Sequence, residues 1–214
     1  MRRNVIGLRE QPRRIAVSGF AGSGKTALCA ALGERLAVPV LSEDMECIEA
    51  VSSPQPPGKE GAVRKNLSDL LDAMIAWHER RKTAYKASPA FVADKWEADI
   101  LAWSMIEFPP SDSAAVDSRG IELVRMVQSS AAEIDCVVMM PFQMPFLPSG
   151  SRDAAGMERR FGFTRLLLWE TVMTGIIKRF TGIPVLKVPA GMMTVQARAD
   201  AVLAGLGSTA AGRK

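Results

Sequence analysis

Residues 18–26 of this chain read Ser-Gly-Phe-Ala-Gly-Ser-Gly-Lys-Thr, and Gly19 to Thr26 fit the pattern G-x-x-x-x-G-K-[ST] of a phosphate-binding loop, or P-loop. The short apolar run Ile15-Ala-Val17 before the motif is typical of a buried strand. Residues 27–36 after the motif have the apolar spacing of a helix. Strand, loop and helix therefore follow one another in the order that such a loop requires.

The residue types in the loop indicate how it would hold a nucleotide. Its glycines let the backbone turn tightly and come close to an anion, and the N–H groups of the loop and helix start then point at phosphate oxygens. Lys25 would hold the β- and γ-phosphates of ATP, and the Thr26 hydroxyl would bind Mg²⁺. The predicted nucleotide site consists of Gly19, Ala21, Gly22, Ser23, Gly24, Lys25, Thr26 and Ala27.

The composition is that of an ordinary globular protein. The chain has 214 residues, of which 48% are hydrophobic and 23% charged, and this length suggests one domain with a sizeable core. No apolar run is long enough for a transmembrane helix, and the basic start is not followed by the apolar segment of a secretory signal. We therefore expect a cytoplasmic protein without a membrane partner.

Cysteine and histidine usage argues against a disulfide framework and against histidine-based zinc sites. Cys29, Cys47 and Cys136 are scattered among apolar neighbours, which favours reduced core thiols. His78 is the only histidine, and its helix carries no carboxylate at the favoured spacing of four residues, so we interpret it as a helix-face residue without a catalytic role.

The net charge of +4 permits nucleic-acid binding but favours another explanation. No basic cluster is interleaved with aromatic residues, as it usually is in single-strand binders. A protein that handles phosphates is therefore the preferred interpretation of the basic balance. The sequence leaves the oligomeric state open and is compatible with a homodimer.

Five short apolar segments alternate with helical patterns, which predicts an α/β fold with a parallel sheet covered by helices on both faces. Ligands of such sheets bind at the carboxyl ends of the strands, and Glu43, Asp94 and Gln143 each follow a predicted strand. Residues 51–62 are too rich in Pro and Gly for regular structure. The predicted strands are 14–18, 39–41, 90–93, 134–140 and 184–188.

With these features in order, the chain resembles the P-loop kinase-like ATPases that include the nicotinamide riboside kinase domain and, more distantly, the deoxynucleoside kinases. The resemblance rests on Gly19 to Thr26, on Glu43, on Phe91-Val-Ala-Asp94-Lys95 with Asp99, and on 134–140 followed by an arginine-bearing segment. It implies a three-layer P-loop NTPase fold with sheet order 2-3-1-4-5. The implied organisation is a flexible arm over 1–12, a kinase-like domain over 13–206 with a lid at about 147–162, and a flexible tail over 207–214.

The chain departs from the family pattern in two places. Relatives often carry Asp-Gly-x-Arg in the lid, whereas this chain has Ser149-Gly-Ser-Arg152 and lacks the leading aspartate. The Asp-Arg pair that usually follows the third strand is Asp94-Lys95 here.

The resemblance also implies roles for individual residues. Glu43 corresponds to the general base that takes a proton from an acceptor hydroxyl, although Asp44 is an alternative, and Asp94 corresponds to the carboxylate on the Mg²⁺ side. Asp94 is equally suited to capping the next helix. The lid arginines would neutralise charge on the transferring phosphoryl group. They are Arg152, Arg159 and Arg160, of which Arg152 and Arg159 join Lys25, Glu43 and Asp94 as predicted catalytic residues and Arg160 joins the nucleotide site.

Other polar and aromatic residues near these positions have plainer interpretations. Asp99 lies one turn after Lys95, so a surface ion pair between them explains its position. Trp96, Trp103 and Trp169 could stack on a ring, but their helical spacing favours the core.

Three hypotheses of function follow from the sequence. The leading one is an ATP- and Mg²⁺-dependent kinase that transfers the γ-phosphoryl group to a hydroxyl of a small molecule, with a nucleoside- or nucleotide-like acceptor favoured by the resemblance alone. The second is a regulatory ATPase that switches the state of a protein partner. The third is a nucleic-acid end kinase.

Overall fold

The structure is a computed structural model that describes residues 14–20, 22–43, 67–107, 114–141, 163–192 and 194–209. It contains a sheet of five parallel strands in the order β2-β3-β1-β4-β5. This confirms the predicted parallel sheet and its strand order. The strands are β1 Arg14–Ser18, β2 Val40–Leu41, β3 Phe91–Asp94, β4 Cys136–Met139 and β5 Val185–Lys187.

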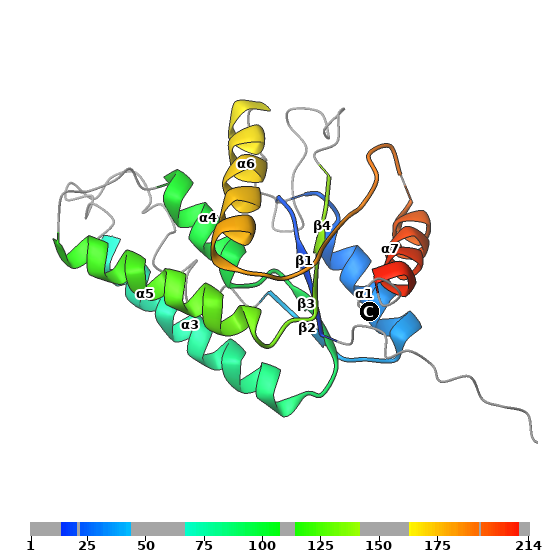
Figure 1. The fold of residues 1–214 in the computed structure, drawn as a ribbon, viewed down its shortest axis with the longest axis horizontal. Coiled ribbons are helices and arrows are strands. Elements are labelled where there is room, and N and C mark those ends of the chain that lie inside the picture. The colour runs from blue at the N-terminus through cyan, green and yellow to red at the C-terminus, as the bar shows by residue number, and fades with distance from the viewer. Residues whose placement is uncertain are drawn as a thin grey trace, which may run out of the picture.

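Helices cover both faces of the sheet, as the alternating pattern predicts. Figure 1 shows α1 and α7 on one face and α3, α4, α5 and α6 on the other. The Thr194 hydroxyl caps the start of α7 by accepting the N–H of Ala197 at 3.2 Å. The described helices are α1 Lys25–Leu36, α3 Leu67–Ala87, α4 Glu97–Glu107, α5 Ala114–Ala131, α6 Phe163–Phe180 and α7 Val195–Thr209.

The side chains of the strands alternate between two cores, because successive residues of a strand point to opposite faces. Ile15 and Val17 pack with Leu28 and Leu32 of α1 and with Val202 of α7. Ala16 belongs to the larger core on the other face. Burial of apolar surface on both faces explains why the strands read as continuous apolar runs.

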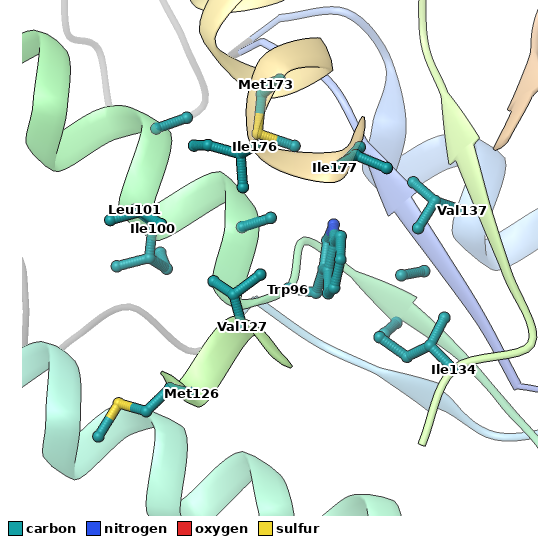
Figure 2. Packing of buried hydrophobic residues seen from close by; sticks show 14 of the residues in the cluster. Trp96, Ile100, Leu101, Met126, Val127, Ile134, Val137, Met173, Ile176 and Ile177 are labelled. Atoms are coloured by element: carbon teal, nitrogen blue, oxygen red, sulfur yellow. The ribbon is translucent and has the colours of Figure 1, made fainter. Parts of the chain in front are cut away.

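The larger core is built around tryptophan and aliphatic side chains from four helices. Trp96 is fully buried, and Figure 2 shows its ring between α6 and the sheet, close to Ile177 and Val137. Trp169 is also buried, and Trp103 packs against the same core. The interpretation of these tryptophans as core residues is thus confirmed.

The register of the sheet brings the carboxyl ends of three strands together. Val17 lies opposite Asp94, and Leu41 lies opposite Ala93, so the P-loop, Glu43 and Asp94 all follow strand ends at one edge. None of the described helices is long and apolar enough to cross a membrane. Cys29 and Cys136 are buried and form no disulfide in the described part of the chain, as predicted, whereas Cys47 lies outside that part.

Candidate active site

The backbone of the P-loop takes a conformation that needs glycine. Gly24, directly before α1, has φ 87°, which is in the left-handed region that side chains rarely adopt. A Cβ atom on Gly19 would lie 2.7 Å from both Met140 Cβ and Ser23 Oγ, so no other residue fits there without a shift. These constraints explain the glycines that the motif requires at positions 19 and 24.

Lys25 is the first residue of α1 and is buried, with 5% of its surface exposed. Its Nζ donates to the carbonyl oxygen of Phe20 at 3.2 Å. Burial lowers the pKa of Lys25, and the charge of Lys95 lowers it further. An anion that entered the P-loop would favour the charged form of Lys25, because it would compensate the two positive charges.

Thr26 and Asp94 meet directly beneath the P-loop. The Thr26 hydroxyl donates to Asp94 Oδ2 at 2.6 Å. Asp94 Oδ1 and Ser23 Oγ are buried and have no hydrogen-bond partner among the described residues. Buried polar atoms are nearly always paired, so an orphan oxygen in the P-loop and another on the partner of Thr26 indicate a site shaped for a ligand.

The chemistry of these groups fits Mg²⁺. Magnesium is commonly held by one or two carboxylates together with substrate phosphates, and its other ligands are usually waters. Thr26 and Asp94 supply a hydroxyl and a carboxylate with a vacant oxygen. Asp94 Oδ2 accepts from Thr26 and Oδ1 has no hydrogen-bond partner among the described residues, so Asp94 does not serve as the cap of α4 that the sequence also allowed.

Asp99 takes a different place from the one expected. It is buried beneath the start of the P-loop, and its carboxylate accepts hydrogen bonds from Ser18 Oγ at 2.8 Å, Trp96 N at 3.2 Å and Gly19 N at 3.4 Å. Burial raises its pKa to about 6, although Lys25 and Lys95 oppose that rise. The predicted surface ion pair between Asp99 and Lys95 is therefore wrong.

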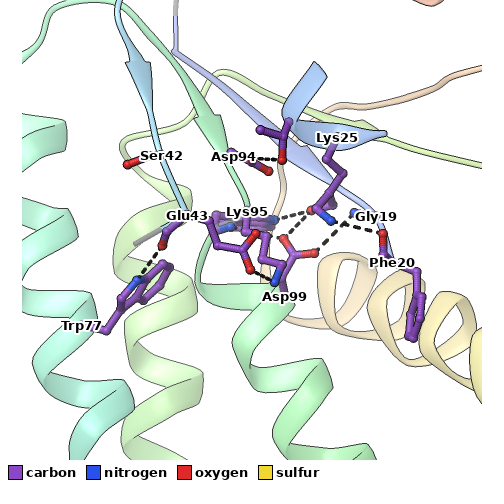
Figure 3. A network of polar contacts seen from close by, with 12 residues as sticks. Gly19, Phe20, Lys25, Ser42, Glu43, Trp77, Asp94, Lys95 and Asp99 are labelled. Atoms are coloured by element: carbon purple, nitrogen blue, oxygen red, sulfur yellow. Dashed lines mark hydrogen bonds and ion pairs between the residues drawn. The ribbon is translucent and has the colours of Figure 1, made fainter. Parts of the chain in front are cut away.

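Lys95 pairs with Glu43 instead, as Figure 3 shows. The two side chains come from the ends of neighbouring strands, β3 and β2, which explains why the spacing along the chain did not reveal the pair. Trp77 Nε1 donates to the Glu43 carbonyl oxygen at 3.0 Å and so fixes the backbone of the predicted base. The backbone of Lys95 has φ 61°, in the left-handed region that residues other than glycine rarely adopt.

The guanidinium of Arg81, on α3, forms hydrogen bonds to the backbone at the ends of both β2 and β3. It donates to the carbonyl oxygens of Ser42, Asp94 and Lys95, the last at 2.6 Å. It also lies over the rings of Trp77 and Tyr85. Arg81 is buried, and its contacts hold the backbone on both sides of the Glu43–Lys95 pair.

A chain of buried polar contacts leads from Arg81 through Tyr85 and Glu97 to His78. Its Nε donates to the Tyr85 hydroxyl, which donates to Glu97 Oε2 at 3.2 Å, and Glu97 Oε1 lies 2.9 Å from His78 Nδ1. His78 is thus a buried residue with a carboxylate partner from α4, which spacing along its own helix could not reveal.

Arg198 is a further residue that sequence analysis missed. It projects from α7 and donates to the carbonyl oxygens of Ser23 at 2.9 Å and Met192 at 2.8 Å. The C-terminal helix therefore braces the P-loop backbone. Nothing in the sequence around Arg198 resembles a motif, so only the fold could show this contact.

The structure brings Lys25, Thr26, Glu43, Asp94 and Lys95 to one edge of the sheet. Their chemical roles remain predictions. Several predicted positions lie outside the described residues: Ala21, Asp44, loop 51–62, Gln143 and the lid arginines Arg152, Arg159 and Arg160.

Comparison with known proteins gives a consistent result for the fold. No protein-family model matches the chain, and no curated protein matches it. Among solved structures, deoxyadenosine kinase from M. mycoides is similar with a TM-score of 0.60 and 13% identity over 91% of this chain and 98% of that one. Thymidylate kinase from Ehrlichia chaffeensis has a TM-score of 0.56 and 13% identity over 90% and 97%.

NadR, solved in complex with NR, is similar with a TM-score of 0.63 and 19% identity. The match covers 93% of this chain but 53% of NadR. The chain has the P-loop kinase-like fold. This confirms, at the level of fold, the likeness to nicotinamide riboside and deoxynucleoside kinases that the sequence suggested.

Proposed function

We propose that this protein is an ATP-dependent kinase that phosphorylates a hydroxyl of a nucleoside-like or nucleotide-like small molecule. The observation that carries the proposal is the Glu43–Lys95 ion pair at the P-loop edge, next to Lys25. A carboxylate so placed can act as a base toward an acceptor, while the two ammonium groups favour a polyphosphate. The solved kinases of the same fold, whose names include a deoxynucleoside and thymidylate, support the choice of acceptor class.

In this proposal the chain acts mainly by positioning and by charge neutralisation. Lys25 and the N–H groups of the P-loop bind the β- and γ-phosphates. Glu43 accepts the proton of the acceptor hydroxyl as its oxygen forms a bond to the γ-phosphorus and the bond from that phosphorus to the bridging oxygen of ADP breaks. Thr26 and Asp94 would hold Mg²⁺, which neutralises phosphate charge when bound.

The predicted lid arginines complete the proposed site from outside the described residues. Arg152, Arg159 and Arg160 would meet charge that develops on the phosphoryl group. Removing them should lower turnover more than ground-state ATP binding.

A phosphate-transfer screen tests the proposal. The protein would be incubated with γ-labelled ATP and Mg²⁺ and with panels of nucleosides, nucleotides and sugars, and hydrolysis without an acceptor would be measured in parallel. A labelled product that Lys25→Ala does not form would support the kinase. Hydrolysis without any labelled acceptor would instead favour the regulatory ATPase, and label on nucleic-acid ends would favour the end kinase.

A further inference from the structure

Asp99 is a buried carboxylate that the proposed mechanism does not use. Only 3% of its surface is exposed, and each of its hydrogen-bond donors is neutral: the Ser18 hydroxyl and the backbone N–H groups of Gly19 and Trp96. It forms no ion pair within the part of the chain that the structure describes. A buried carboxylate without an ion-pair partner is costly to keep ionised.

The charge of Asp99 depends on two lysines that it does not touch. Lys25 of the P-loop and Lys95 after β3 favour its ionised form, while burial disfavours it, and its pKa is raised to about 6. Glu43 and Asp94 are the other carboxylates that act on Lys25.

The core residues of α5 and α6 that pack against α4 are apolar. Val127 of α5 and Met173 and Ile176 of α6 belong to the core against α4, as Figure 2 shows. Lys25 and Lys95, together with the hydrogen bonds from Ser18 and Trp96, therefore favour the ionised form of Asp99 at neutral pH against the effect of burial.

We propose that Asp99 positions the start of the P-loop and takes up a proton from solvent when the phosphates of a nucleotide occupy that loop. This inference rests on the proposed function, because it requires that the loop bind a nucleotide. Phosphates would bring negative charge next to Lys25 and Lys95 and so compensate the charges that keep Asp99 ionised. The carboxylate then becomes a neutral acid, and no other bond changes.

The geometry indicates which oxygen receives the proton. Asp99 Oδ2 accepts two hydrogen bonds, from Ser18 and Trp96, whereas Oδ1 accepts one long bond of 3.4 Å from Gly19. A proton on Oδ1 leaves both contacts of Oδ2 in place. The carboxyl group can thus change its charge and still join the P-loop to the start of α4.

Proton uptake makes nucleotide affinity depend on pH with a defined sign. The bound state holds more protons than the free state. Nucleotide affinity therefore falls as the pH rises from about 6, the pKa of Asp99 in the free protein, to the higher pKa of Asp99 in the bound protein. The slope reaches at most about tenfold in affinity per pH unit for one proton.

Isothermal titration calorimetry can count the protons directly. Mg²⁺·ADP would be titrated into the full chain at pH 7 under excess Mg²⁺, in two buffers with different enthalpies of ionisation. Wild-type protein should take up a substantial fraction of one proton, and Asp99→Asn should take up almost none. Asp135→Asn is the matched control, because Asp135 also accepts a backbone N–H, from Arg14 at 3.0 Å, but lies at the amino end of β4. It should keep the wild-type uptake.

The outcomes separate the inference from the proposed function. Wild-type protein that binds Mg²⁺·ADP with the same heat in both buffers would overturn the inference and leave the kinase proposal intact. Undiminished uptake in Asp99→Asn would overturn it too and assign the proton to Lys25. Wild-type protein that fails to bind any adenine nucleotide would defeat the proposed function and this inference with it. If Asp99→Asn does not fold, the wild-type pH profile decides, because uptake by Lys25 would grow toward alkaline pH whereas uptake by Asp99 would decline.

Discussion

Thr26 and Asp94 lie in hydrogen-bond contact at 2.6 Å, and the second oxygen of Asp94 is buried without a partner. We expect Asp94→Asn to keep this contact through the amide oxygen but to lose the charge that a magnesium ion would need. Loss of a partner that only supports a metal ligand typically weakens metal affinity by about 10- to 100-fold, so a loss of at least this order is expected for Asp94. Titration of Mg²⁺ into the protein with ATP present measures the effect. An unchanged Mg²⁺ requirement would remove Asp94 from the predicted metal site.

Lys25→Ala should weaken ATP binding without unfolding the protein. The substitution removes a charge-assisted contact to phosphate, which is worth about 1.5–3 kcal/mol, or roughly 10- to 150-fold in affinity. Calorimetry with ATP and Mg²⁺ measures the loss. Lys82→Ala is the control, because Lys82 is a half-exposed lysine of α3 that pairs with Glu79. Equal affinity in the wild type and in Lys25→Ala would contradict the P-loop assignment.

Glu43→Gln should lower phosphate transfer by about 10²- to 10⁴-fold, the usual contribution of a general base. ATP affinity should stay close to the wild-type value, because the Glu43 carboxylate pairs with Lys95 after β3 and is not one of the groups proposed to bind phosphate. Transfer to an acceptor from the screen is compared with hydrolysis by water, which should fall less. If transfer is unchanged, the base is Asp44 or another carboxylate.

Arg81→Lys should lower the stability of the protein and slow transfer together. A lysine keeps the charge but cannot reach the three carbonyl oxygens that Arg81 joins, and a lost hydrogen bond to a charged group costs roughly 1.5–3 kcal/mol. Urea denaturation measures the free energy of unfolding.

Arg119→Lys provides the comparison for Arg81. Arg119 makes half-exposed ion pairs with Asp72 and Glu122, and such pairs are worth about 0–1 kcal/mol. Equal unfolding free energies in the two variants would show that Arg81 does not hold the strand ends.

The strands, the P-loop and the helices could be predicted from the sequence, because the local residue pattern of each segment agrees with its place in the fold. Ile15 and Val17 belong to a continuous apolar run within β1, and Gly24 and Lys25 lie in a motif whose conformation is set by the chain itself. Periodicity marked the helices for the same reason. The strand order came from the family resemblance, since local patterns do not state which strands are neighbours.

Contacts across the sheet could not be derived in this way. Asp99 lies four residues from Lys95, so the sequence favoured a surface ion pair between them. In the fold Asp99 is buried against Ser18, and Lys95 forms its ion pair with Glu43. His78 likewise finds Glu97 on another helix. Arg81 and Arg198 bind carbonyl oxygens, and backbone acceptors have no signature in a sequence.

The first strand of the chain lies in the middle of the sheet, and this has a consequence during synthesis. β1 pairs with β3, which starts at Phe91, and with β4, which starts at Cys136. A nascent chain that has not yet released β4 leaves one side of β1 without backbone partners, and the P-loop brace from Arg198 arrives later still. Such long-range pairing slows folding and prolongs the exposure of apolar strands. We therefore expect the nucleotide site to form only after the residues of α7 have been synthesised.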